Sequence, residues 1–163
     1  LQVIGEKSLG KYRPCVGIVL IKNGLVFAAQ RIDYKSKAWQ MPQGGIEHKE
    51  SAKKAAFREL KEETGISKKN IEIICQTKDW IKYDLPRDLV PKLWGGNYIG
   101  QKQIWFGAKY LGLDKDININ TEHPEFCAWS WMKRGEIERK IVPFKKLVYQ
   151  KVFEDFSNDI DFK

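Results

Sequence analysis

The chain has 163 residues, of which 42% are hydrophobic and 31% are charged, and these values are typical of one globular domain with its own core. No apolar run approaches the roughly 20 residues of a membrane helix, and no signal-peptide pattern is visible, so we expect a cytoplasmic protein. Lysine and arginine number 29 against 21 acidic residues, a net charge of +8 that favours a polyanionic partner without identifying it.

Hydrophobic patterning predicts strands and helices in a mixed series. Two apolar, β-branched runs within residues 14–31 are joined by Asn23-Gly24, a two-residue turn typical of a β-hairpin. A loop at 32–37 then leads to a segment rich in glycine and glutamate at 44–66. The later elements are a strand pair or long bent strand at 71–82, a loop at 85–100, strands at 103–111 and 126–132, and an amphipathic closing helix over 144–156. These elements imply a sheet that lies between helices.

Neither the cysteines nor the histidines indicate a metal site. Cys15, Cys75 and Cys127 lie far apart within apolar segments, so we expect reduced core thiols and no disulfide or zinc framework. His48 and His123 are isolated from each other, and we expect both to be exposed to solvent.

The 44–66 segment carries the strongest functional pattern. Glu59, Glu62 and Glu63 are three and four residues apart, so they share one face of a predicted helix. Carboxylates crowded in this way repel one another unless a cation lies among them, and a divalent cation with hard oxygen ligands is the natural partner. Ser51 is a candidate N-cap and Gly65 a candidate left-handed C-cap. The alternative is a solvated charged helix, which does not explain the glycines and the clustered carboxylates together.

The same segment resembles a known family motif. Its fixed positions match the Nudix box without departure: Gly44, Glu50, Arg58-Glu59-Leu60, Glu62-Glu63 and Gly65-Ile66. The chain therefore resembles the Nudix hydrolases, which cleave a nucleoside diphosphate linked to another moiety. The resemblance implies an α/β/α sandwich with a mixed β-sheet, as a single domain over 12–157. Residues 1–11 would be an N-terminal extension and residues 158–163 a C-terminal tail.

Segments outside the box are similar to the bacterial RNA pyrophosphohydrolases, which are also described as dinucleoside polyphosphate hydrolases and invasion-associated Nudix proteins. The matching segments are 12–14, 16–19, 39–46, 99–103, 105–106, 124–126, 129–131 and 142–145. The region 32–38 is slightly longer than expected and 85–98 is variable. Both are candidates to line the substrate entrance, which leaves detailed specificity open.

The resemblance assigns the metal and catalytic roles. Glu59, Glu62, Glu63 and Glu125, with a backbone carbonyl near Gly44, would bind two or more Mg²⁺ or Mn²⁺ ions together with substrate. Either Glu62 or Glu125 would act as general base. Arg58 would orient a carboxylate, and Glu50 would steady the loop and the helix.

The resemblance also assigns a substrate site. Its residues are Arg13, Arg31, Tyr83, Val142, Phe144 and Lys145, with cations for phosphate and apolar side chains for a base. Phe144 could equally be a core residue at the start of the last helix, and Lys145 part of a solvated helix face. Trp80, Trp94 and Trp105 are more typical of core or rim positions than of base platforms.

Three functions remain open at this point. The first is hydrolysis of the 5′-triphosphorylated or diphosphorylated end of RNA to a monophosphate, and the second is hydrolysis of dinucleoside polyphosphates such as diadenosine tetraphosphate. The third is an RNA-binding Nudix module without catalysis, which the intact glutamates disfavour. A nucleotide-pool cleansing enzyme is the remaining possibility. No membrane and no obligate protein partner is indicated.

Overall fold

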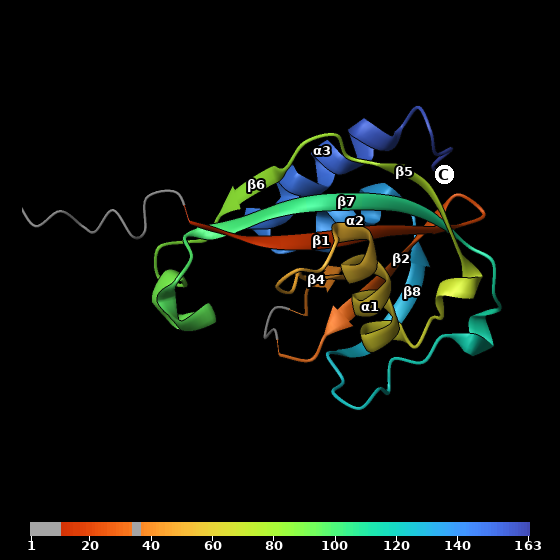
Figure 1. Cartoon of the computed structure of the whole chain (residues 1–163). Helices are drawn as coiled ribbons and strands as arrows, with labels where there is room; N and C mark the ends of the chain where they lie inside the picture. Colours follow the sequence, from red (N-terminus) through yellow and green to blue (C-terminus); the bar gives the residue numbers. More distant parts are fainter. Residues whose placement is uncertain (1–10, 34–36) are drawn as a thin grey trace, which may run out of the picture.

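The computed structural model describes residues 11–33 and 37–163, so the predicted extension up to residue 10 and residues 34–36 of the 32–37 loop lie outside the described part. Eight strands and three α-helices are present in it (Figure 1). The strands are β1 Tyr12–Lys22, β2 Leu25–Arg31, β3 Trp39–Gln40, β4 Gln43–Gly45, β5 Ile71–Gln76, β6 Ile81–Asp84, β7 Gly100–Tyr110 and β8 Phe126–Met132. The helices are α1 Ala52–Thr64, α2 Arg134–Lys140 and α3 Lys146–Phe156.

All eight strands belong to one mixed sheet. Its main order is β3-β2-β1-β7-β5, with β4 paired to β1, β6 paired to β7 and β8 paired to β2. β1 and β7 run parallel, from Tyr12 opposite Gly100 to Ile21 opposite Lys109, and the other pairs are antiparallel. Gly17 is required here, because a Cβ at this position would overlap the ring of Trp105 on the neighbouring strand. The predicted mixed sheet is confirmed.

The hairpin between β1 and β2 is also confirmed. Asn23 has φ 53° and Gly24 has φ 76°, the left-handed pair that a two-residue turn of this kind requires. Side chains of β1 alternate between two faces: Val16, Ile18 and Leu20 pack toward α1.

Two cores therefore lie on the two faces of the sheet, which gives the predicted α/β/α sandwich. Figure 1 shows α1 on one side of the sheet and α2 and α3 on the other. Ala55, Ala56 and Leu60 of α1 are buried in one core, while Val152 and Phe153 of α3 are buried in the other. The small side chains of α1 allow its backbone to approach the sheet closely.

Several boundaries differ from the predicted ones. The 71–82 segment is two strands, and both pair with β7 rather than with each other. β7 begins at Gly100 instead of 103, because Gln101 and Gln103 are buried polar strand residues. The hydroxyl of Tyr83 donates to Gln101, the amide of Gln103 donates to the same oxygen, and Trp105 donates to Gln103. These side-chain hydrogen bonds satisfy the buried polar groups, whose polar character had made this part of the strand look like a loop in the sequence.

The helical C-terminal region contains a helix that the pattern missed. α2 has seven residues, and Ile137 is its only buried one. The segment therefore lacks the repeating apolar positions by which a helix is recognised in a sequence. The closing helix is confirmed, although it begins at Lys146 after a 3₁₀ turn at Pro143–Lys145. No helix within 11–33 and 37–163 is long and apolar enough to cross a membrane.

The cysteine prediction was correct for pairing and wrong for burial. All three described cysteines are free, yet only Cys15 is buried, while Cys75 is half-buried and Cys127 is exposed. Cys127 lies on β8, which pairs only with β2 and so stands at an edge of the sheet. Solvent reaches one face of this edge strand, so Cys127 is exposed although its segment is apolar in sequence.

Candidate active site

The helix α1 holds the predicted acidic cluster, and its ends are defined as expected. The Ser51 hydroxyl accepts a hydrogen bond from the Lys54 backbone amide at 3.2 Å. Gly65 takes a left-handed conformation, φ 71°, and its N–H donates to the Lys61 carbonyl. These caps fix where the helix starts and stops, and hence which way each glutamate points.

Arg58 ties the helix to the glycine loop in front of it. Its guanidinium forms two hydrogen bonds to Glu50, both at 2.8 Å, and one to the carbonyl of Gly45 at 2.8 Å. The same group reaches Glu59 at 2.9 Å and Glu62 at 3.3 Å. These contacts agree with the predicted positioning roles of Arg58 and Glu50, because one planar cation fixes both the loop and the carboxylates.

The Arg58 contact predicts how Glu50 affects stability. Hydrogen bonding to Arg58 lowers the pKa of Glu50 from 4.5 to about 2. We expect Glu50→Gln to lower the free energy of unfolding at pH 7 by roughly 1.5–3 kcal/mol, the usual worth of hydrogen bonds to a charged group. Because the pKa of Glu50 is lower in the folded protein than in the unfolded chain, its ionised carboxylate stabilises the fold at pH values above 4.5. This stabilisation is lost as the pH falls through about 2. The difference from wild type should therefore shrink between pH 4.5 and pH 2, as measured by urea unfolding. A difference that is constant over this range would contradict the assigned pairing.

Glu63 is buried at the inner edge of the helix and Glu59 is half-buried there. Only 3% of Glu63 is exposed, and its Oε2 accepts a hydrogen bond from the backbone amide of Gln43 at 3.3 Å. Burial raises the pKa of Glu63 well above its ordinary value, and the carboxylate of Glu125 adds to the effect. Burial also raises the pKa of Glu59, although Arg58 partly opposes this. Two carboxylates are thus held out of water close to one another.

Glu125 arrives at the same place from a distant part of the chain. It precedes β8, and its backbone carbonyl accepts a hydrogen bond from Ile32 at 3.0 Å, which anchors it beside the end of β2. Its carboxylate is 3.8 Å from the Arg31 guanidinium. Glu59 and Glu125 line two adjoining hollows, so the acidic cluster stands between them.

The first hollow, about 370 Å³, contains every predicted substrate residue together with Gly44, Glu59 and Glu125. Arg13, Arg31 and Lys145 supply three cations to its wall. Lys145 is buried, which lowers its pKa to about 8, and the positive charge of Arg31 contributes. The alternative that Lys145 belongs to a solvated helix face is therefore wrong.

Aromatic and apolar side chains form the rest of that wall. The rings of Tyr83 and Phe144 are 5.9 Å apart, and Val142 lies beside them in the lining. Phe144 is half-buried and packs against the core while it lines the hollow, so its place is compatible with both predicted roles. The guanidinium of Arg13 lies 5.1 Å from the ring centroid of Trp94.

The loop at 85–98, which the sequence gives as a candidate lining of the substrate entrance, contributes four residues that no pattern singled out. Leu85, Leu89, Leu93 and Trp94 line the hollow from the loop between β6 and β7. The sequence favours a core or rim position for Trp94, and no pattern within the loop singles out its three leucines. Trp105, by contrast, is a core residue as expected, and Trp80 is 40% exposed.

The second hollow, about 540 Å³, lies on the other side of the carboxylates. Glu62 and Glu63 line it with Arg58, Lys61 and His123, and with Thr121, Glu122, Glu59 and Glu125. Glu62 has 59% of its side chain exposed, so it is the most accessible of the three helix glutamates. His48 and His123 are both exposed, as predicted.

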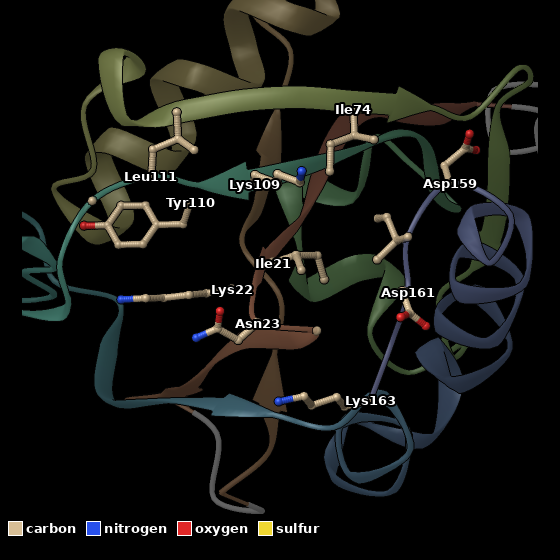
Figure 2. Close-up of a pocket in the computed structure, with 13 residues that line it drawn as sticks. Ile21, Lys22, Asn23, Ile74, Lys109, Tyr110, Leu111, Asp159, Asp161 and Lys163 are labelled. Carbon is tan, nitrogen blue, oxygen red and sulfur yellow. The ribbon is translucent and has the colours of Figure 1, made fainter.

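A further hollow of about 890 Å³ contains none of the predicted site residues. It lies at the opposite end of β1 and β7, around Lys22, Lys109 and Lys163 (Figure 2). Asp159 and Asp161 lie in the same lining. This lining mixes acidic and basic side chains, and it shares no residue with the hollow that Glu62 and Glu63 line.

The carboxylates fit a divalent cation, although they do not form a closed cage. Within residues 11–33 and 37–163, no three His, Cys, Asp or Glu side chains converge as a ready metal site. Yet Oε1 of Glu63 is buried without a hydrogen-bond donor, and a Cβ at Gly44 would overlap the Glu59 carboxylate. A buried, unpaired carboxylate oxygen facing other carboxylates is a donor set for a hard cation.

Comparison with known proteins places this arrangement in context. The model of the NUDIX domain matches residues 11–152. An RNA pyrophosphohydrolase of Dinoroseobacter shibae is 53% identical over 148 residues, which cover 90% of this chain and 92% of that protein. An RNA pyrophosphohydrolase of Wolbachia pipientis is 50% identical over 152 residues, 92% of each chain. Among solved structures, the E. coli dihydroneopterin triphosphate pyrophosphohydrolase superposes with a TM-score of 0.69 at 19% identity, over 90% of this chain and 99% of that one.

Proposed function

The chain belongs to the NUDIX family and is a pyrophosphohydrolase of that family, and from this premise we propose that it removes pyrophosphate from the 5′-triphosphorylated end of RNA. A diphosphorylated end would lose phosphate, and both products carry a 5′-monophosphate. The observation that carries the proposal is the pocket in which Arg13, Arg31 and Lys145 face Glu59 and Glu125 beside an aromatic wall. A polyphosphate next to a base fits this combination of charges and surfaces.

The carboxylates would hold the metal ions that the chemistry needs. We assign Glu59, Glu62, Glu63 and Glu125, with a backbone carbonyl near Gly44, as ligands of Mg²⁺ or Mn²⁺. Bound divalent cations neutralise phosphate charge and lower the pKa of a water molecule. Arg58 keeps Glu59 and Glu62 in position through its hydrogen bonds at 2.9 and 3.3 Å.

The cations of the pocket would bind the polyphosphate. Lys145 is buried, and the Arg31 guanidinium donates two hydrogen bonds to Asp33 at 2.7 Å. Both side chains are therefore already ordered and lose little conformational entropy on binding substrate. Arg13 stacks on Trp94, which leaves its guanidinium edge for a phosphate oxygen. Val142 and Phe144 would flank the first bases.

Proton transfer needs one carboxylate in contact with the attacking water. Glu62 is accessible from one hollow only, whereas Glu125 lines both. Solvent reaches both carboxylates, since 59% of the Glu62 side chain and 46% of the Glu125 side chain are exposed. Comparing the kcat-pH profiles of Glu62→Gln and Glu125→Gln assigns the base, because only loss of the base removes the acidic limb.

Substrate preference tests the proposal directly. The protein is incubated with Mg²⁺ and, separately, with 5′-triphosphorylated RNA, diadenosine tetraphosphate and a modified nucleoside triphosphate, and kcat/KM is compared. We expect the RNA to have the highest value. If diadenosine tetraphosphate is cleaved far faster than the RNA end, the alternative dinucleoside polyphosphate activity replaces the proposed one.

Arg13 provides a test of the binding half of the site. We expect Arg13→Ala to raise KM for triphosphorylated RNA about tenfold, since one charged contact to phosphate is lost. The dependence of log KM on log salt should flatten by about 0.7, the value for one phosphate contact on a single strand. An unchanged salt dependence would return Arg13 to a structural role against Trp94.

A further inference from the structure

A separate basic hollow of about 440 Å³ lies at the same end of the sheet as the proposed catalytic pocket. Its lining is Lys11, Tyr12, Lys82, Asn97, Tyr98 and Lys102, and every charged residue in it is a lysine. Figure 1 shows α1 over the middle of the sheet, while β6 and the first residues of β1 and β7 extend beyond it. Among the described residues, α1 therefore does not cover this end of the sheet.

Strand alternation places the two hollows on opposite faces of the same strands. Arg13 and Gln101 line the catalytic pocket, and their chain neighbours Tyr12 and Lys102 line the basic hollow. Successive side chains of a strand point to opposite faces, so the two sites are separated only by the thickness of the sheet. A chain that runs from the first pocket to the second must pass round this end of the sheet.

Within residues 11–33 and 37–163, the lysines of the basic hollow have no acidic partner. Lys82 and Lys102 lie directly opposite each other on β6 and β7, and like charges in this register destabilise a sheet. No described carboxylate forms an ion pair with Lys11, Lys82 or Lys102. The nearby Asp84 instead accepts the hydroxyl of Tyr12 at 2.6 Å. An anion between the strands would relieve the repulsion.

Aromatic rings hold the two lysines in place. The ammonium of Lys82 is 5.3 Å from the ring centroid of Tyr12, and that of Lys102 is 4.7 Å from the ring centroid of Trp80. Cation–π contact orders both groups before any ligand arrives. Lysines interleaved with exposed rings are the surface that single-stranded nucleic acids use, through phosphate contacts and base stacking.

An aromatic contact connects the basic hollow to the catalytic pocket. The rings of Trp94 and Tyr98 are 6.3 Å apart, and Trp94 lines the pocket whereas Tyr98 lines the hollow. Arg13 stacks on the same Trp94 ring. One continuous wall of rings and cations thus runs from the proposed phosphate site to Lys82 and Lys102.

We propose that the basic hollow binds the phosphates of the nucleotides that follow the first two of a single-stranded RNA, while its 5′ end occupies the catalytic pocket. The inference rests on the proposed function and extends it: substrate affinity depends on RNA beyond the reacting end. A dinucleoside polyphosphate is too short to use this surface.

The test varies RNA length and the two opposed lysines together. The substrates are a 5′-triphosphorylated dinucleotide and an unstructured triphosphorylated RNA of about eight nucleotides, within the usual site size for single strands. In Lys82→Gln/Lys102→Gln we expect KM for the longer RNA to rise about tenfold with kcat unchanged. Its salt dependence should flatten by about 1.4, or about 0.7 for each lost phosphate contact. KM for the dinucleotide should not change.

The matched control removes the same charge at the other end of the sheet. Lys69 and Lys115 are exposed, beside the paired ends of β5 and β7, and Lys69→Gln/Lys115→Gln should behave as wild type on both substrates. Equal KM values for the two double variants on the longer RNA would overturn the inference, as would an equal loss on the dinucleotide. If wild type cleaves neither triphosphorylated substrate, the proposed function itself fails.

Discussion

Replacing Glu62 with glutamine lowers kcat on triphosphorylated RNA by a factor of roughly 10³ or more and leaves the protein folded. The magnitude follows from the two roles open to this residue, because a general base or a metal ligand typically contributes that much. The fold survives because Glu62 is 59% exposed and its one described contact is Arg58, at 3.3 Å. Steady-state kinetics and the thermal midpoint measure the two effects separately.

An exposed glutamate on another helix is the control for this result. Glu154 lies on α3 and lines neither of the two hollows beside Glu59 and Glu125, so Glu154→Gln should keep the wild-type kcat. Activity that survives in Glu62→Gln, with Glu59 and Glu63 intact, would mean that the metal site is built from other residues. If Glu62→Gln loses both its activity and its fold, the pH profile of Glu125→Gln decides instead. An acidic limb that persists in Glu125→Gln would assign the base role to Glu62.

Gly44→Ala is the second large effect that we expect. The new Cβ would occupy the place of the Glu59 carboxylate, which is the flexible end of a side chain and moves aside at little cost in stability. A displacement of about 1 Å in a catalytic group lowers activity by about 10². We therefore expect kcat/KM to fall about a hundredfold while the thermal midpoint stays within a few degrees of wild type.

Gly135→Ala distinguishes this displacement from a general effect of added bulk. A Cβ at Gly135 in α2 meets only Arg139, at an ordinary contact distance of 3.5 Å. Alanine also favours a helix over glycine, so this variant should be as active as wild type and equally or more stable. Full activity in Gly44→Ala would show that the position of Glu59 beside the loop is unimportant for catalysis.

The sequence was sufficient to bring three of the acidic residues together, because they lie on one helix whose period is known. Ser51 and Gly65 mark the ends of that helix in the sequence, and spacing alone placed Glu59, Glu62 and Glu63 on one face. Glu125 was different, since nothing local in the chain brings it to the helix. Only the resemblance to a family indicated that position, and the structure brings it beside Glu63.

The walls of the pocket were the least predictable part. The backbone N–H of Leu85 donates to the carbonyl of Ile99 at 2.8 Å, and the N–H of Ile99 donates to the carbonyl of Lys11 at 3.0 Å. These hydrogen bonds fold the loop back over β1, so Trp94 and the leucines of the loop face the site. Such backbone contacts between distant residues leave no periodic trace in the sequence. The short helix α2, with Ile137 as its only buried residue, escaped detection for a related reason.

Specificity and catalysis thus depend on different levels of the structure. Three of the proposed metal ligands come from one helix, whereas Glu125 and the proposed substrate residues Arg13, Arg31, Phe144 and Lys145 come from separate segments that the sheet assembles. A change in the loop at 85–100 would therefore alter which substrate enters without disturbing the carboxylates.

Product analysis of triphosphorylated RNA tests the central claim most directly. RNA carrying a 5′-triphosphate is incubated with the protein and Mg²⁺, and the released phosphates and the RNA end are identified. We predict pyrophosphate and a 5′-monophosphorylated RNA, with no turnover after chelation of the divalent ions. An RNA end that remains triphosphorylated, or cleavage that continues undiminished in the presence of the chelator, would contradict this prediction.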